Sequence, residues 1–87
     1  MSYRVEIFRE AEKTLETLDK VMDQRIRKKL RELAQAPLDP RLSKQMETAK
    51  DQRYSRVGDW HIIFRVNEPG ETLDILAIRP RGRAYRK

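Results

Sequence analysis

The chain has 87 residues, enough for one domain, 1–87, with a single small hydrophobic core. Its 20 lysines and arginines outnumber its 14 aspartates and glutamates, and the net charge of +6 favours an anionic partner such as nucleic acid. The lack of cysteine excludes disulfides and thiolate metal sites, and no apolar run resembles a signal peptide or a membrane span. We therefore expect a cytoplasmic protein that does not enter the membrane.

The first elements predicted along the chain are one strand and two helices. Residues 3–7 alternate apolar and polar side chains, which is typical of a half-buried strand. Residues 11–18 carry apolar side chains at i, i+4 and i+7, the spacing of an amphipathic helix. Asp19 can cap a second helix, which Pro37 must end. So short a link between two helices predicts a helical hairpin.

The second half of the chain predicts a loop followed by three strands. Residues 37–50 are polar and show no sustained period, so we expect a connecting loop there. Beyond it, apolar and polar side chains alternate in three runs separated by turn residues. The predicted strands are 53–57, 60–66 and 72–78, with turns at Gly58–Asp59 and 67–70.

This order of elements predicts an α+β fold of two layers. A helical hairpin should pack on one face of a mostly antiparallel four-stranded sheet, because both elements have one apolar side to bury. The large apolar residues of 60–66 should face the helices, so the residues between them point from the opposite face. The polar or aromatic residues expected on that face are Tyr54, Arg56, His61 and Arg65.

The last nine residues form a basic run directly after the final predicted strand. They include Arg79, Arg81, Arg83, Tyr85, Arg86 and Lys87, and no acid. Guanidinium groups bind phosphates in a bidentate manner, which makes RNA the leading candidate partner. The plainer interpretations are a solvated basic tail and a tail that binds ribosomal RNA without chemistry.

Two sequence blocks carry a resemblance to a known family. The first is Arg56-Val57-Gly58-Asp59-Trp60 within the sheet residues 53–66, and the second is Arg81-x-x-x-Tyr85. With the opening residues 3–5 and the helical residues 11–18, they resemble the RelE/ParE toxins of type II toxin–antitoxin pairs over nearly the whole chain. The resemblance implies the fold predicted above. It also implies a cognate antitoxin, RelB-like or other, whose acidic or amphipathic segment masks the basic face.

The RelE branch of this family consists of ribosome-dependent endoribonucleases that cut messenger RNA without a metal or other cofactor. The resemblance therefore implies that the ribosome and messenger RNA are partners, with Arg81, Tyr85 and His61 as the catalytic residues. Arg81 would stabilise charge on the phosphate, while Tyr85 and His61 both remain candidates for the proton acceptor. Tyrosine normally titrates near pH 10, so Tyr85 needs the arginines around it to act as a base.

Five other residues are predicted to bind the RNA. They are Tyr54, Arg56, Arg65, Arg79 and Arg83. Arg56 matches a basic position of the RelE pattern, and Tyr54 can stack on a nucleobase. Arg65 can equally be a solvated strand residue. With one histidine and no cysteine, we expect no metal site.

Two departures from the RelE pattern leave other functions open. His61 stands where that pattern usually has arginine, and Arg79-Pro80-Arg81-Gly82 replaces the usual ending of the last strand. The ParE branch keeps the fold but lacks the catalytic set, and it poisons DNA gyrase. A third alternative is a degenerate member that only binds nucleic acid or represses its own operon.

Overall fold

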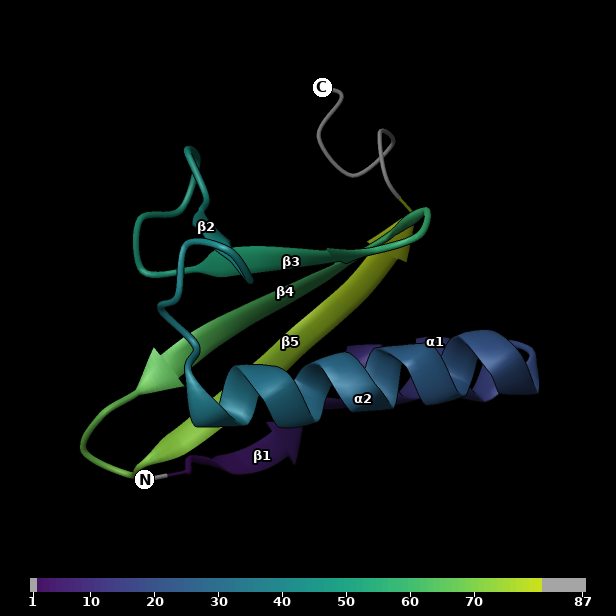
Figure 1. Cartoon of the computed structure of the whole chain (residues 1–87), viewed down its shortest axis with the longest axis horizontal. Coiled ribbons are helices and arrows are strands. Elements are labelled where there is room, and N and C mark those ends of the chain that lie inside the picture. The colour runs from purple at the N-terminus through teal and green to yellow at the C-terminus, as the bar shows by residue number, and fades with distance from the viewer. Residues whose placement is uncertain (1, 81–87) are drawn as a thin grey trace.

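The computed structural model of the chain describes residues 2–80, so Arg81, Arg83 and Tyr85 lie outside the described residues. The elements are β1 (Arg4–Ile7), α1 (Arg9–Thr17), α2 (Lys20–Gln35), β2 (Lys44–Gln45), β3 (Arg53–Val57), β4 (Trp60–Asn67) and β5 (Thr72–Pro80) (Figure 1). The sheet order is β1-β5-β4-β3-β2, with β1 parallel to β5 and the other pairs antiparallel. The predicted α+β class with a mostly antiparallel sheet is confirmed.

The described sheet has five strands, one more than the sequence predicts. The additional strand, β2, lies in the segment expected to be a loop, where Lys44 pairs with Tyr54 and Gln45 pairs with Arg53. A strand of two residues has no alternation to detect, so its position depends on the partner strand β3. The hydrogen bond from the Met46 amide to the Gln52 carbonyl, 2.9 Å long, extends this pairing beyond β2.

Local signals in the sequence account for both ends of α2. Asp19 lies at the N-cap, where its Oδ1 accepts a hydrogen bond of 2.8 Å from the Met22 amide, as predicted. The helix ends at Gln35, two residues before Pro37. The first helix ends one residue earlier than Leu18, whose backbone is extended.

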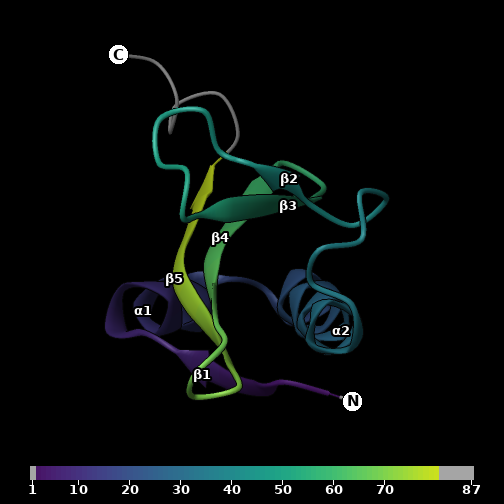
Figure 2. The same cartoon turned by 90° about the vertical axis from the view of Figure 1, so that its left-hand side faces the viewer.

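The helices and the sheet share one hydrophobic core. α1 contacts β5, and α2 contacts β1 and β3. Ile62 and Phe64 are fully buried in this core, and Trp60 and Val66 are half-buried against it, which confirms the face predicted for β4. Figure 2 shows the helices and β1 at one end of the molecule, and β2, β3 and the end of β5 at the other.

A β-bulge interrupts the pairing of β4 with β5. Ile63 pairs with Ala77, but the next residue, Phe64, pairs with Ile75. Leu76 is therefore an extra residue in β5 with no partner of its own on β4. A bulge of this kind changes which side chains of the strand share a face.

The bulge determines the face from which Arg79 points. Before it, Leu73 and Ile75 are buried in the core; after it, Ile78 is buried there. Strict alternation from Leu73 would place Arg79 among the core residues. Because Leu76 adds one residue, Arg79 instead lies on the opposite face of the sheet.

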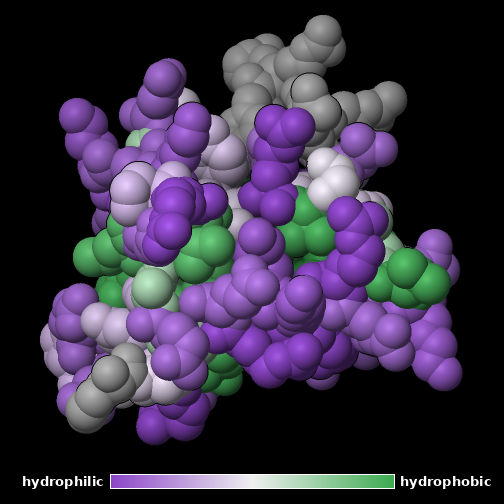
Figure 3. Space-filling model, viewed as in Figure 1, coloured by the Kyte–Doolittle hydropathy of each residue, from purple (hydrophilic) through white to green (hydrophobic). Residues whose placement is uncertain are grey.

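The surface over α2 is predominantly hydrophilic, with small separate hydrophobic areas (Figure 3). The large apolar residues exposed in the described region are Phe8, Val21 and Leu38, which lie far apart in the sequence. Neither described helix has the length and apolar character needed to cross a bilayer.

The tight turn between β3 and β4 depends on Gly58, whose φ of 58° lies in the left-handed region. A Cβ at this position would also lie 3.3 Å from the Met22 Cε atom. We expect Gly58→Ala to lower the free energy of unfolding by about 1–2 kcal/mol, measured by urea denaturation.

Gly70→Ala is the matched control for this substitution, because Gly70 does not have a positive φ and its nearest neighbour is the side chain of Asn67. It should cost clearly less stability than Gly58→Ala. Equal unfolding midpoints for the two variants would contradict the role assigned to Gly58.

Candidate nucleic-acid interface

Three of the predicted site residues lie in one row across the sheet. Arg56 on β3 pairs with His61 on β4, and His61 pairs with Arg79 on β5. Directly paired residues point from the same face, and neighbouring strands lie about 4.8 Å apart, so the row spans roughly 10 Å. Two guanidinium groups and an imidazole therefore share the face opposite the core.

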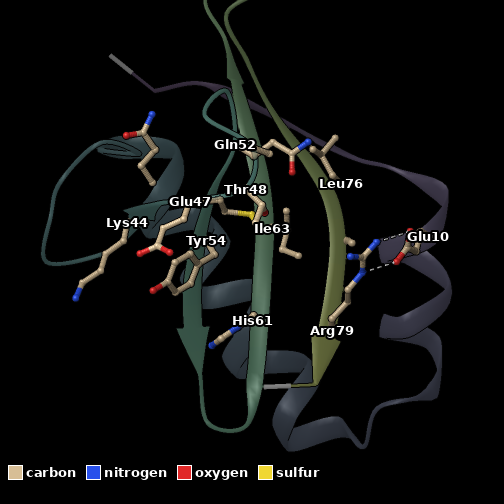
Figure 4. Close-up of a pocket in the computed structure, with 14 residues that line it drawn as sticks. Glu10, Lys44, Glu47, Thr48, Gln52, Tyr54, His61, Ile63, Leu76 and Arg79 are labelled. Carbon is tan, nitrogen blue, oxygen red and sulfur yellow. Dashed lines mark hydrogen bonds and ion pairs between the residues drawn. The ribbon is translucent and has the colours of Figure 1, made fainter. Parts of the chain in front are cut away.

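His61 is the least exposed member of this row, with only 6% of its surface accessible. Its ring lies beside that of Tyr54, with centroids 5.0 Å apart and planes tilted by 42° (Figure 4). The sequence places His61 on the correct face but does not predict this burial, which results from Tyr54 lying diagonally across the strand pair. His61 is therefore held in place by its neighbours and is not a solvated surface histidine.

Arg79 forms an ion pair with a residue that the sequence did not single out. Its Nε lies 3.0 Å from Glu10 Oε2 and its Nη2 lies 3.3 Å from Oε1 (Figure 4). Glu10 belongs to the first turn of α1, so the contact joins residues 69 positions apart, and no local pattern could reveal it. The pair places one carboxylate at the end of a basic row.

Arg65 is separated from the row of Arg56, His61 and Arg79. It lies four positions beyond His61 along β4, a distance of about 13 Å. Its Nη2 lies 3.4 Å from the Oδ2 of Asp74, which is itself buried. An RNA contact through Arg65 stays a prediction, but the ion pair gives this arginine a role within the fold.

An open cleft of about 940 Å³ lies beside the row. Figure 4 shows Gln52 and Leu76 towards one end of this cleft, and His61 and Arg79 towards the other. Its lining combines apolar side chains from β4 and β5 with polar ones from the segment between β2 and β3. The lining residues are Glu10, Lys44, Gln45, Met46, Glu47, Thr48, Ala49, Gln52, Tyr54, His61, Ile63, Leu76, Ala77 and Arg79.

A smaller groove of about 280 Å³ adjoins this cleft, and Tyr54 and His61 line both hollows. Four basic residues and no acid line it: Lys29, Arg41, Lys44 and Arg56. Within residues 2–80, Lys44 and Arg56 form no ion pair with a carboxylate. Their charges are thus available to an anionic ligand.

Arg41, by contrast, is already engaged at the rim of this groove. Its Nη2 lies 2.9 Å from Asp39 Oδ2, and its backbone amide donates to Asp39 Oδ1. The side-chain hydrogen bonds from Arg41 lower the pKa of the Asp39 carboxyl. Arg41 therefore orders the loop before β2 more than it offers charge to a ligand.

The same loop is held against β3 by partly buried hydrogen bonds. Arg53 Nε donates to Ser43 Oγ at 2.8 Å, and Ser55 Oγ donates to the Leu42 carbonyl at 2.6 Å. These bonds explain why Ser43 and Ser55 are buried although both are polar. They also fix the start of β2, so that Lys44 borders both hollows.

The sequence was also compared with known protein families and with curated proteins. A sequence model described as the ParE toxin of type II toxin–antitoxin systems, parDE, matches residues 5–85. The chain belongs to the RelE/ParE family of toxins. None of the curated proteins matches it in sequence.

Solved structures of this toxin family have the same fold. The archaeal RelE–RelB complex from Pyrococcus horikoshii matches with 30% identity and a TM-score of 0.76, covering 95% of this chain and 99% of that one. The RelBE2 toxin–antitoxin complex from Mycobacterium tuberculosis matches with 23% identity and a TM-score of 0.80, covering 93% and 100%. The isolated RelE toxin from Escherichia coli matches with 14% identity and a TM-score of 0.80, covering 97% and 89%.

The Glu10–Arg79 pair generates a prediction about RNA affinity. Because the carboxylate competes with phosphate for Arg79, Glu10→Gln should tighten binding of a labelled single-stranded RNA about two- to fivefold at low salt. The gain should shrink as salt is added, since the pair is about half exposed. Fluorescence anisotropy titrations measure both effects.

Glu16→Gln is the control, because it changes the net charge equally from an exposed position on the same helix. An equal gain in affinity from both substitutions would show that overall charge, and not release of Arg79, is responsible.

Proposed function

We propose that this toxin is a ribosome-dependent endoribonuclease that cuts messenger RNA and thereby inhibits translation. The observation that carries the proposal is the row formed by Arg56, His61 and Arg79 on one face of the sheet. β5 leads directly from this row into the segment that contains Arg81 and Tyr85. Cations and two candidate proton-transfer groups thus belong to adjoining parts of the chain.

RNA cleavage of this kind needs three things from the protein. A base removes the proton of the 2′-hydroxyl, which attacks the neighbouring phosphorus; an acid protonates the departing 5′-oxygen; and cations stabilise the charge that develops on the phosphate. The products are a 2′,3′-cyclic phosphate and a 5′-hydroxyl. We assign the charge role to Arg81, assisted by Arg56 and Arg79, and the proton transfers to Tyr85 and His61.

The protein supplies few catalytic groups, and we propose that the ribosome supplies the substrate geometry that they need. Holding the messenger in a bent geometry, with the 2′-oxygen in line with the departing oxygen, lowers the barrier without any further protein group. The toxin then needs to supply only charge and proton transfer. For the same reason we expect little cleavage of RNA in the absence of ribosomes.

A cognate antitoxin is proposed to bind this toxin and neutralise it. Two of the related structures, those from Pyrococcus horikoshii and Mycobacterium tuberculosis, are toxin–antitoxin complexes. The net charge of +6 favours an antitoxin with an acidic segment that covers the basic row. Such an association should be fast at low ionic strength and slow down as salt screens the charges.

Primer extension on ribosome-bound messages tests the activity. The wild type should cut them, and Arg81→Ala and Tyr85→Phe should each lower the single-turnover rate about 100-fold or more, because each removes a charge or a proton-transfer group. Intact messages with the wild-type toxin would refute the proposal.

Two substitutions of His61 separate its possible roles. If the imidazole acts as a positive charge, His61→Arg should keep most of the cleavage rate while His61→Ala loses it. If His61 transfers a proton, both variants should lose the rate to a similar degree. Full activity of His61→Ala would remove this residue from the catalytic set.

Inhibition of DNA gyrase is the second candidate function, because the matching family description names the ParE toxin. Expression would then cause gyrase-dependent DNA breaks while messages stay intact. The same primer-extension experiment, run beside a gyrase cleavage assay on plasmid DNA, distinguishes the two functions.

A further inference from the structure

We propose that the larger cleft binds a nucleobase next to the phosphate-binding row and sets the base preference of cleavage. This inference rests on the proposed nuclease function and extends it to Gln52, Ile63 and Leu76, which have no role there. The subsite consists of an apolar floor, one aromatic wall and a polar edge supplied by the segment between β2 and β3.

The floor is unusual for the outer face of a sheet. Ile63 and Ala77 are buried, with 3% and 2% of their surfaces accessible, yet they lie outside the main core cluster. Leu76, the extra residue of the bulge, is only half-buried and gives this floor accessible apolar surface. Apolar side chains here match the flat faces of a nucleobase better than they match a phosphate.

Tyr54 supplies the aromatic wall. It pairs with Ile63 across β3 and β4, so its ring rises from the same face as the floor. Proteins that read single-stranded RNA commonly stack splayed-out bases on aromatic rings and bind their edges by hydrogen bonds. Because Tyr54 also contacts His61, a base against this ring lies next to the row.

The distance along the strands fits a single nucleotide. Ile63 follows His61 by two residues on β4, which corresponds to about 7 Å. A phosphate held at the row can therefore have its own sugar and base directed into the cleft. The row and the floor belong to the same two strands, so their separation does not depend on a loop.

Gln52 supplies the polar edge. Its side chain lines the same end of the cleft as Leu76 (Figure 4), and within residues 2–80 the side-chain amide makes no hydrogen bond. A glutamine amide offers a donor beside an acceptor, the combination that reads the edge of a base in pairs of hydrogen bonds. Thr48 adds a hydroxyl on the same side.

The segment that carries these groups is held by hydrogen bonds of its own. The backbone amide of Gln52 donates to the Ala49 carbonyl at 2.9 Å, and Gln45 Nε2 donates to the Lys50 carbonyl at 2.7 Å. The Gln52 carbonyl accepts from the Met46 amide at 2.9 Å. A base-reading group on an ordered turn can discriminate, because little ordering is needed on binding.

Single-turnover cleavage on ribosomes tests this inference. Messages that differ only in the base next to the cut bond should be cleaved by the wild type at rates that differ by roughly tenfold or more. Gln52→Ala should reduce the ratio between the best and worst base about tenfold, mostly by slowing the best. Thr48→Ala should reduce it less, and Gln24→Ala, an exposed change on α2, should leave it unchanged.

The outcomes separate the inference from the proposed function. If the wild type cuts messages but Gln52→Ala keeps the same ratio, or if the wild type shows no base preference, the nucleobase subsite is refuted and the nuclease stands. If the wild type cuts nothing, both fail. If Gln52→Ala weakens binding of the purified antitoxin without changing the ratio, the cleft is part of the antitoxin interface, and the subsite is likewise refuted.

Discussion

The site depends on the β-bulge at Leu76 and on the strand register that the bulge sets. Ile75 and Ile78 belong to the same buried core cluster although they are three positions apart, and only an extra residue between them lets both face it. Burial of these two side chains therefore fixes the bulge, and the bulge turns Arg79 towards the open face. A slip of one residue would place this arginine in the core, at a high cost in desolvation, so packing of the core also enforces the geometry of the row.

The open face combines charge, aromatic surface and apolar surface within a few residues of β3, β4 and β5. The row of Arg56, His61 and Arg79 is suited to phosphate, and the floor beside Tyr54 is suited to a base. Glu10 lowers the positive potential at one end of the row when no ligand is bound. This arrangement favours a partner that presents both a phosphate and an aromatic ring, as a nucleotide does.

The sequence predicted the elements, the fold class and the face of β4, because period and turn residues are local signals. Asp19 and Gly58 were identified from such signals, and the structure confirms the cap and the turn. The short strand β2, the burial of His61 and the pairing of Glu10 with Arg79 could not be predicted in this way. Each depends on residues that are distant in sequence and meet only when the strands pair and α1 packs beside β5. Alternation alone would also have assigned Arg79 to the wrong face.

A double-mutant cycle on Arg56 and Arg79 tests the central claim that the row acts on one ligand. Arg56 lies on β3 and Arg79 on β5, and β4 separates the two strands. The two side chains do not contact each other, so the effects of the two substitutions on the free energy of unfolding should add. In single-turnover cleavage on ribosomes, Arg56→Ala and Arg79→Ala should each slow the reaction, and the double variant should be slowed clearly less than the product of the two effects. We expect a coupling of about 1 kcal/mol or more through the shared phosphate. Strictly multiplicative effects on the rate would contradict the account.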